Sequence, residues 1–162
     1  MTLCLDIRAT SALWRTLPRA RTLARATIAA CIVESKFADR ARIDVSLRLT
    51  DDAELQALNA RWRGIDKPTN VLSFPSPPVD RFGETRMLGD IALAYETLAR
   101  EAEEEGASMA DHYCHLVAHG FLHLVGYDHQ TDKEAELMEE LEKRVLARLG
   151  ITDPYADELP EI

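Results

Sequence analysis

The sequence lacks the features by which membrane proteins, disulfide-rich secreted proteins and zinc–thiolate proteins are identified. No apolar run approaches the ~18 residues that span a bilayer, and Asp6 interrupts the N-terminal segment where a signal peptide would stay apolar. The 3 cysteines, Cys4, Cys31 and Cys114, are odd in number, far apart and without a Cys-x-x-Cys pair. We therefore expect a cytoplasmic protein with reduced thiols, which has neither a disulfide framework nor a thiolate zinc site.

Positive charge is scarce in the second half of the chain. Residues 1–90 contain 14 Lys and Arg against 11 Asp and Glu, whereas residues 91–162 contain 5 against 17, which together give the net charge of −9. A wholly acidic protein binds polyanions poorly, because phosphate contacts need Lys and Arg. Basic residues cluster early, within 15–25 and 61–67, and they indicate either a basic face or the solvated side of amphipathic helices.

Length and patterning predict one compact domain over residues 1–162, of the α/β or α+β class. With 46% apolar and 29% charged residues, the composition is that of an ordinary globular protein. Alternating or apolar stretches predict strands at 3–8, 43–49, 70–74 and 88–94. Helical periodicity predicts helices at 12–33, 51–62, 95–105, 109–125 and 132–149.

Capping and helix-breaking residues refine these boundaries. Pro18 must lie near the start of the first helix or break it, and Thr50, Ser108 and Thr131 are the expected N-caps of the second, fourth and fifth. Residues 76–86 are expected to form an exposed loop. The strand that follows is mostly apolar on both faces, which favours either a central position in the sheet or a covered edge.

All five histidines fall within residues 112–129, a clustering that indicates a local need for imidazole. At 100° per residue, four of them lie on one narrow stripe of a helix: His112, His115, His119 and His123. The stripe runs too far along the helix axis for one ion to contact all four.

The segment from His119 to His129 selects three of the five. His119 and His123 lie one helical turn apart, and Gly126 can adopt a positive φ that ends the helix. His129 then returns as a third ligand from another direction. Three imidazoles with one open position are typical of a catalytic zinc site, although neutral imidazole also suits Ni²⁺, Co²⁺ and Cu²⁺.

The spacing His-x3-His-x2-Gly-x2-His also matches the metzincin proteases. Their general base is the glutamate that follows the first histidine, and this position holds Gly120. The comparison therefore supports the metal site and argues against the peptidase mechanism.

The segment 119–129, taken with Trp62–Pro75 and Leu88–Ile91, closely resembles the motifs of the YbeY family of bacterial endoribonucleases. The similarity covers roughly residues 40–155, and the histidine segment is its most specific part. It implies a single α+β domain with a small mixed sheet packed with helices. It also implies a zincin-like metal-binding helix, with one zinc ion per chain held by His119, His123 and His129.

The function implied by the resemblance is a zinc-dependent endoribonuclease, specific for single strands, in 16S rRNA 3′-end maturation and ribosome quality control. Its partners are then single-stranded RNA, the 16S rRNA precursor and the small ribosomal subunit, with no membrane and no DNA partner. Two other hypotheses stay open. One is a non-catalytic ribosome assembly factor with a structural metal, and the other is a metallohydrolase of another substrate.

The family's catalytic arginine corresponds to Arg63, and Trp62 stands where the family often has tyrosine. A guanidinium is a natural planar clamp for the non-bridging oxygens of a phosphodiester. From the residues alone, Arg63 is also explained as a favourable cation at a helix C-terminus. No carboxylate or histidine is an obvious general base.

The sequence also predicts the positions or roles of several residues near the three histidines. His112 and His115 are predicted to be buried core residues, and His115 is alternatively a support for His119 or an RNA contact. Asp128 either orients a ligand by accepting its ring N–H or caps the following helix.

Electrostatics predicts where the charged surfaces lie. The acids of the last helix should face away from a cleft that admits a polyanion: Glu134, Glu136, Glu139, Glu140 and Glu142. The positive border should come from Arg61, Arg63, Lys67 and part of residues 15–25, with Arg63 on the rim of the histidine cleft.

Overall fold

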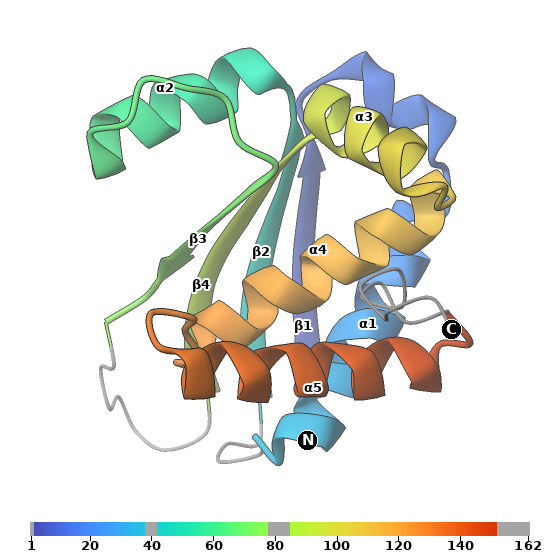
Figure 1. Ribbon diagram of the computed structural model, residues 1–162, viewed down its shortest axis with the longest axis vertical. Coiled ribbons are helices and arrows are strands. Elements are labelled where there is room, and N and C mark those ends of the chain that lie inside the picture. The colour runs from blue at the N-terminus through green and yellow to red at the C-terminus, as the bar shows by residue number, and fades with distance from the viewer. Residues whose placement is uncertain (1, 38–41, 78–84, 152–162) are drawn as a thin grey trace.

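The computed structural model describes residues 2–37, 42–77 and 85–151, in which helices pack on a four-stranded sheet (Figure 1). Along the chain the elements are β1 (Thr2–Ala9), the 3-10 helix η1 (Ala12–Thr16), α1 (Ala20–Ser35), β2 (Arg42–Thr50), α2 (Asp52–Arg63), β3 (Val71–Pro75), β4 (Thr85–Ala94), α3 (Tyr95–Glu105), α4 (Met109–Leu124) and α5 (Asp132–Arg148). The predicted order of strands and helices is confirmed. The loop expected at 76–86 falls mostly on residues 78–84, which lie outside the described residues.

The strand order in the sheet is β1-β2-β4-β3. β1 pairs with β2 and β2 pairs with β4 in parallel, whereas β3 runs antiparallel to β4 at the edge. The sheet is therefore mixed and the class is α+β, as the resemblance implied. β4 has a strand on each side, so of the two positions that its apolar sequence favours, the central one is confirmed.

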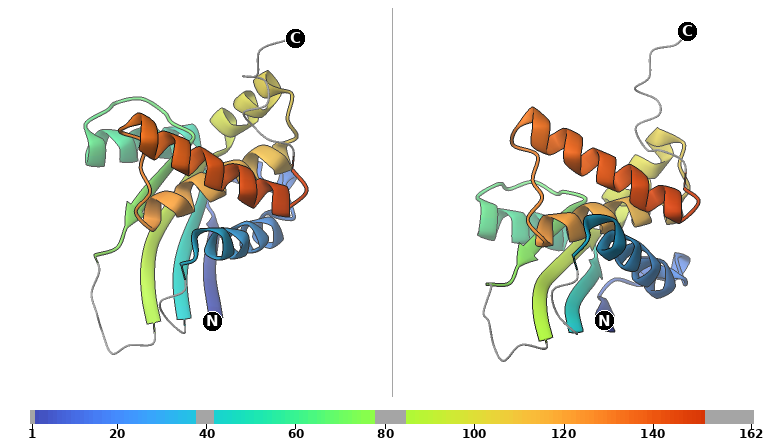
Figure 2. Two further views of the ribbon diagram at one scale, coloured as in Figure 1. Left: turned by 60° about the horizontal axis from the view of Figure 1, so that its bottom comes forward. Right: turned by 90° about the horizontal axis from the view of Figure 1, so that it is seen from below.

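The helices cover the two faces of the sheet unequally. Successive residues of a strand point to opposite faces, and in β4 the side chains of Ile91 and Leu93 join the main core beneath α1 and α4. Ala92 and Ala94 join a smaller cluster with Leu55 of α2. Figure 2 shows α5 outermost, over α4 and α1. Within the described ranges, none of the helices has the length and apolarity that a bilayer crossing requires.

At one helix boundary the structure decides between two predicted alternatives, and at another it differs from the prediction. Pro18 breaks the first predicted helix, so that η1 ends at Thr16 and α1 begins at Ala20. The expectation that Thr50 caps α2 is wrong, because Thr50 is still in β2 and the Asp51 carboxylate accepts the Glu54 N–H at 2.9 Å. Thr50 is still paired with β4 at the end of β2, so the helix begins one residue later. Asp51 then caps it, because an aspartate is as good an N-cap as a threonine.

Gly89 lies where the backbone of β4 passes close to that of β3. Its φ of +138° belongs to a region used almost only by glycine, and an added Cβ would lie 2.2 Å from the Phe74 carbonyl oxygen. Because that contact is with backbone, no side-chain rotation can relieve it. Gly89 therefore allows the edge strand β3 to pair with β4 in the observed register.

We predict that Gly89→Ala lowers the free energy of unfolding by about 3–5 kcal/mol, since strain and a backbone clash add. Gly106→Ala is the matched control: its φ is +69°, but nothing lies within 4 Å of the added Cβ, so only about 1–2 kcal/mol is expected. Urea denaturation followed by circular dichroism measures both. Equal losses in the two variants would contradict the role given to the contact with Phe74.

Candidate metal centre

Three histidines converge where α4 ends. α4 stops at Leu124, and Gly126 turns the chain back with a φ of +104°. The turn is closed by the Gly126 N–H, which donates to the His123 carbonyl at 3.1 Å. The chain therefore returns toward its own helix, and His129 meets His119 and His123 as the spacing predicted.

The geometry of the three rings suits one ion. One nitrogen from each of His119, His123 and His129 lies within 4.8 Å of the others, and the set could hold a metal ion. The ring centroids are 4.6 Å apart for 119–123, 5.2 Å for 123–129 and 5.8 Å for 119–129. His129 is exposed and the other two are half-buried, so the site is open to solvent on one side.

The outer nitrogens of two rings are held by acceptors. His123 Nδ1 lies 2.9 Å from the Tyr127 carbonyl oxygen, which can only accept, so this nitrogen carries the proton. His119 Nδ1 lies 2.6 Å from Glu142 Oε1 and donates to it in the same way. Both Nε2 atoms then present lone pairs to each other, 3.1 Å apart.

Facing lone pairs require a cation between them, and this is the test of fit for a metal. Two nitrogens bound tetrahedrally at about 2.0–2.1 Å are about 3.3 Å apart, close to the observed spacing of the Nε2 atoms. A single proton could join two of the rings, but a third nitrogen also converges on the same point. Burial and the neighbouring His119 lower the pKa of His123, which keeps this ring neutral and able to bind a metal.

Glu142 is a functional residue that the sequence analysis placed wrongly. We expected it to face away from the cleft with the other acids of α5, yet it is 1% exposed and bonded to His119. Burial raises the pKa of its carboxyl, but hydrogen bonds from His115 and His119 outweigh this and lower it to about 2. An ionised carboxylate on the ring N–H of a ligand fixes its orientation and raises its basicity.

A signal for Glu142 does exist in the sequence. Met138, Leu141 and Val145 form the buried stripe of α5, and position 142 falls within it at helical spacing. A charged residue on an apolar stripe needs a partner. That criterion separates Glu142 from the exposed Glu140.

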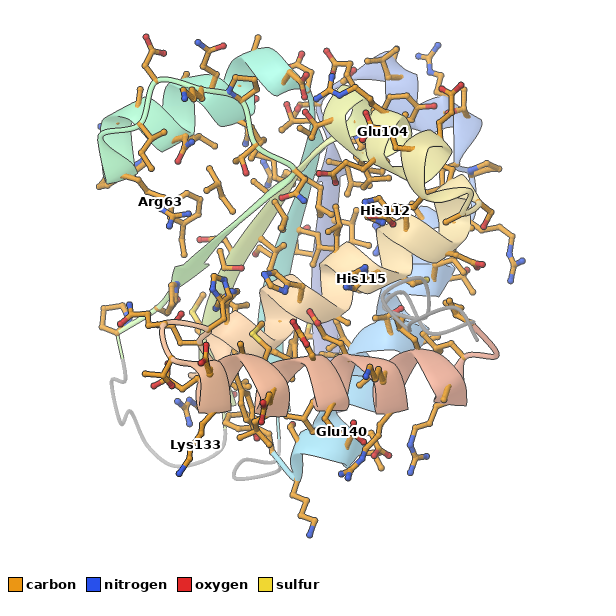
Figure 3. All side chains as sticks on the ribbon, in the orientation of Figure 1. Arg63, Glu104, His112, His115, Lys133 and Glu140 are labelled. Carbon is orange, nitrogen blue, oxygen red and sulfur yellow. The ribbon has the colours of Figure 1, made fainter. Side chains whose placement is uncertain are left out.

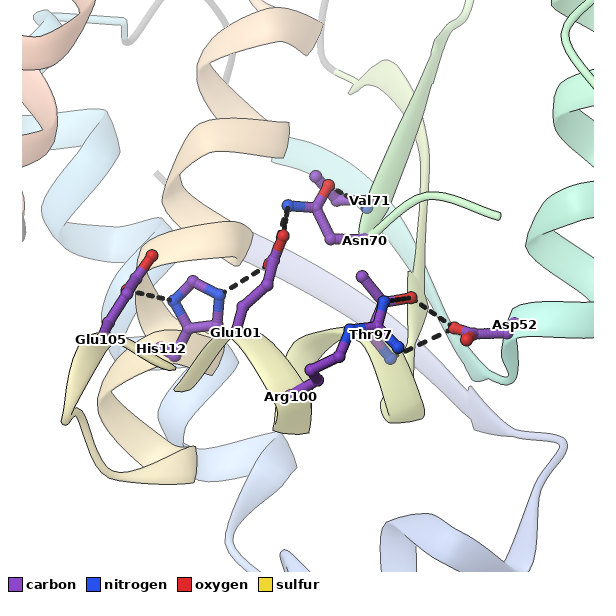
Figure 4. Close-up of polar contacts among 8 residues, drawn as sticks. All are labelled: Asp52, Asn70, Val71, Thr97, Arg100, Glu101, Glu105 and His112. Atoms are coloured by element: carbon purple, nitrogen blue, oxygen red, sulfur yellow. Dashed lines mark hydrogen bonds and ion pairs between the residues drawn. The ribbon is translucent and has the colours of Figure 1, made fainter. Parts of the chain in front are cut away.

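The remaining two histidines support the structure around the site. His112 is 4% exposed, and its Nε2 lies 2.9 Å from Glu101 while its Nδ1 lies 3.4 Å from Glu105 (Figure 4). Its prediction as a buried core residue is confirmed. His115 lies 3.8 Å from Glu142, so it is a neighbour of the carboxylate that holds His119.

Glu101 connects His112 to the loop before β3. Burial raises the pKa of this carboxyl, but the hydrogen bonds that it accepts from His112 and Asn70 outweigh burial and lower it. The contact with Glu101 thereby holds the Asn70 side chain (Figure 4). Asn70 lines the same cavity as the three histidines.

Arg63 and the three histidines line one cavity of about 780 Å³, which we call the histidine cavity. Arg63 is the last residue of α2, and Figure 3 shows it on the side of the molecule where α4 ends. Both interpretations of this arginine therefore hold geometrically, because it ends a helix and also borders the cavity. Arg63 is the only lysine or arginine among the described residues that line this cavity.

Of the wider basic border that we expected, Arg63 lines this cavity, whereas Arg61 and Lys67 are not in its lining. Arg15 and Arg21 line a separate hollow beside η1, and Arg61 instead lies over the ring of Trp62, 5.0 Å from its centroid. Asp128 also differs from both alternatives, since its carboxylate accepts the backbone N–H of His129 at 2.8 Å and Thr131 caps α5. It fixes the returning chain.

Gly120 shows why no general base stands after the first histidine. Its α-carbon faces the sheet, and an added Cβ would lie 2.9 Å from Ile91 Cγ2. A glutamate here would point into β4 and away from the metal. The absence of the metzincin base is therefore a consequence of how α4 packs.

Comparison with known proteins matches the chain to one family. The family model for Endoribonuclease YbeY matches residues 10–150. An Endoribonuclease YbeY of Rhodopseudomonas palustris is 56% identical over 133 residues, which cover 80% of this chain and 76% of that protein. One from Methylocella silvestris is 48% identical over 159 residues, covering 98% and 89%. A solution structure from Thermotoga maritima shares the fold, with a TM-score of 0.53 at 23% identity over 99% and 97% of the two chains.

We predict that Glu142→Gln weakens binding of a divalent metal by about 10- to 100-fold, because the amide keeps the shape of the carboxylate but loses its charge. Competition with a chromophoric chelator measures the affinity. Glu140→Gln is the control, since its side chain is 51% exposed on the same helix. Equal affinities in the two variants would show that Glu142 does not act on the metal centre.

Proposed function

The chain belongs to the endoribonuclease YbeY family, and on that premise we propose that it is a metal-dependent endoribonuclease that cleaves single-stranded RNA. The proposed substrate is the 16S rRNA precursor, cut during 3′-end maturation in the cytoplasm and in contact with the small ribosomal subunit. A part in ribosome quality control belongs to the same proposal.

One observation supports this proposal above the others. Arg63 and the histidine triad are 56 positions apart in the sequence, yet they line the same cavity. Phosphodiester cleavage needs stabilisation of charge on the non-bridging oxygens, and a guanidinium supplies it with planar, paired donors. A peptidase would need neither this arginine nor a glycine in place of its base.

Zinc is the metal that we propose, held by His119, His123 and His129. A divalent ion bound there supplies a Lewis acid that acidifies water and polarises a phosphoryl oxygen. The protein's own part is to hold the two half-buried ligand rings. Glu142 fixes His119 and the Tyr127 carbonyl fixes His123, and each contact leaves the Nε2 atom of its ring free to hold an ion.

The proposed role of Arg63 is to clamp the scissile phosphate at the edge of the metal centre. The side chain is exposed, so it can move onto a substrate without leaving a packed position. Its neighbour Gly64 has a φ of +70° and ends α2, so that Arg63 stands in the last turn of the helix, where it lines the cavity.

We predict that His129→Ala loses metal and lowers RNA cleavage at least about 100-fold, while the metal-free protein unfolds at an unchanged temperature. This ligand is the best choice because it is exposed, whereas truncation of His119 would also remove a hydrogen bond from the buried Glu142 carboxylate and so disturb the core. Metal analysis, a cleavage assay on a 16S 3′-end RNA with and without chelator, and calorimetry give the three readouts.

Two outcomes of that experiment would decide against the proposal. If His129→Ala still cleaves RNA at the rate of the original chain, the metal is not part of the reaction. If the variant unfolds and the original chain does not cleave RNA, the metal is structural, and a non-catalytic assembly factor becomes the better interpretation.

We predict that Arg63→Ala lowers kcat by about 100- to 1000-fold with full metal content, since one donor to the developing charge is lost. Arg63→Lys should recover part of the activity because the charge remains, although the paired donors are gone. Arg144→Ala, on the exposed side of α5, is the matched control. Single-turnover cleavage measures the effect, and a loss confined to KM would instead indicate simple docking.

A further inference from the structure

Trp62 places a large aromatic surface in water at the end of α2. Its side chain is 62% exposed, so most of the ring surface is accessible to a ligand that could stack on it. The Arg61 guanidinium lies 5.0 Å from the ring centroid. Trp62 is thus flanked in sequence by one arginine that contacts it and by a second, Arg63, that borders the histidine cavity.

A second hollow adjoins the histidine cavity at this tryptophan. It has a volume of about 730 Å³ and lies between α2 and the face of the sheet opposite the main core; we call it the sheet groove. Its lining includes Leu58, Trp62, Phe74 and Ala92. Trp62 and Phe74 also line the histidine cavity, so the two hollows share an aromatic wall.

The charges in the sheet groove do not suit phosphate. Three acids and two bases line it: Asp6, Glu54, Asp90, Arg8 and Arg48. Arg8 lies 3.8 Å from Asp6, and Arg48 is paired with Glu54. A polyanion finds no net positive charge there. A neutral, flat group with polar edges fits better, because it can stack on the aromatic wall and bond to the carboxylates.

We propose that Trp62 and Phe74 form a stacking platform for one RNA base, whose edge lies in the sheet groove while its phosphate lies at Arg63. Residues adjacent on a helix point about 100° apart. Accordingly, Arg63 lines the histidine cavity and not the sheet groove, whereas Trp62 lines both. The sheet groove and Arg63 thus lie on two sides of Trp62, as the base and the phosphate lie on two sides of the sugar in a nucleotide. The inference rests on the proposed function, since it places the substrate of that site.

Base stacking on aromatic side chains tolerates any sequence, because every base has a π-face. The platform therefore accounts for selection of single strands, since a paired base is already stacked and cannot reach the wall. It also predicts that one nucleotide beside the cleaved bond matters more for binding than the others.

The first test is fluorescence of the full chain, treated with chelator so that RNA is bound but not cut. The chain has 2 tryptophans, of which Trp14 is 3% exposed and Trp62 is 62% exposed. Acrylamide quenching therefore reports on Trp62. We expect a short single-stranded RNA to reduce this quenching and a duplex of the same sequence not to do so. Unchanged quenching at saturating RNA would overturn the proposal.

The second test combines Trp62→Ala with RNA that lacks one base. In the original chain, an abasic nucleotide at one position should weaken binding about tenfold, and Trp62→Ala should do the same with intact RNA. The two losses should not add, because both remove one stack. Trp62→Phe should keep most of the affinity. Leu137→Ala, with a side chain 54% exposed on α5, is the control and should bind RNA normally.

Failure of the platform and failure of the nuclease proposal give different results. If the metal-loaded chain cleaves RNA but the losses from Trp62→Ala and the abasic position simply add, the platform is refuted and the nuclease stands. If RNA protects Trp62 and the losses do not add, but metal-loaded protein cuts no RNA, the platform stands and the nuclease does not.

Discussion

The close contact between α4 and the sheet at Gly120 is the constraint on which the arrangement of the site depends. An added Cβ would lie 3.2 Å from Ser73 Oγ as well as against Ile91, so a glycine lets the helix reach this depth. The Ser73 hydroxyl then donates to the Gly120 carbonyl at 2.9 Å. Because His119 precedes this residue and His123 follows one turn later, the depth of the helix fixes where both ligand rings stand relative to β3.

A buried charge holds the other side of the metal centre. Isolated in the core, the Glu142 carboxylate would be strongly destabilising; bonded to His119, it joins α5 to α4 and orients a ligand at the same time. The acidic residues of α5 therefore have two different roles. One carboxylate belongs to the site, whereas acids such as Glu140 keep the outer face of the helix in water.

Much of this architecture follows from local sequence, and the parts that do not are set by packing. Alternation, caps and the glycine at 126 predict the element order and the histidine triad, because these depend on neighbours a few residues away. The cap at Asp51 and the burial of Glu142 depend on how strands and helices meet, and the sequence analysis placed both wrongly. The shared wall at Trp62 joins segments that only the fold brings together.

The compactness of the ligand set has a consequence for the unfolded chain. His119, His123 and His129 lie within eleven consecutive residues, so a disordered segment can still gather them around an ion at small entropic cost. A metal that binds both states stabilises the fold less than its affinity suggests. An ion held by these three histidines would therefore be only weakly coupled to folding, in contrast to an ion whose ligands are distributed along a chain. A newly made chain could gather the three histidines around such an ion before α5 and Glu142 are in place.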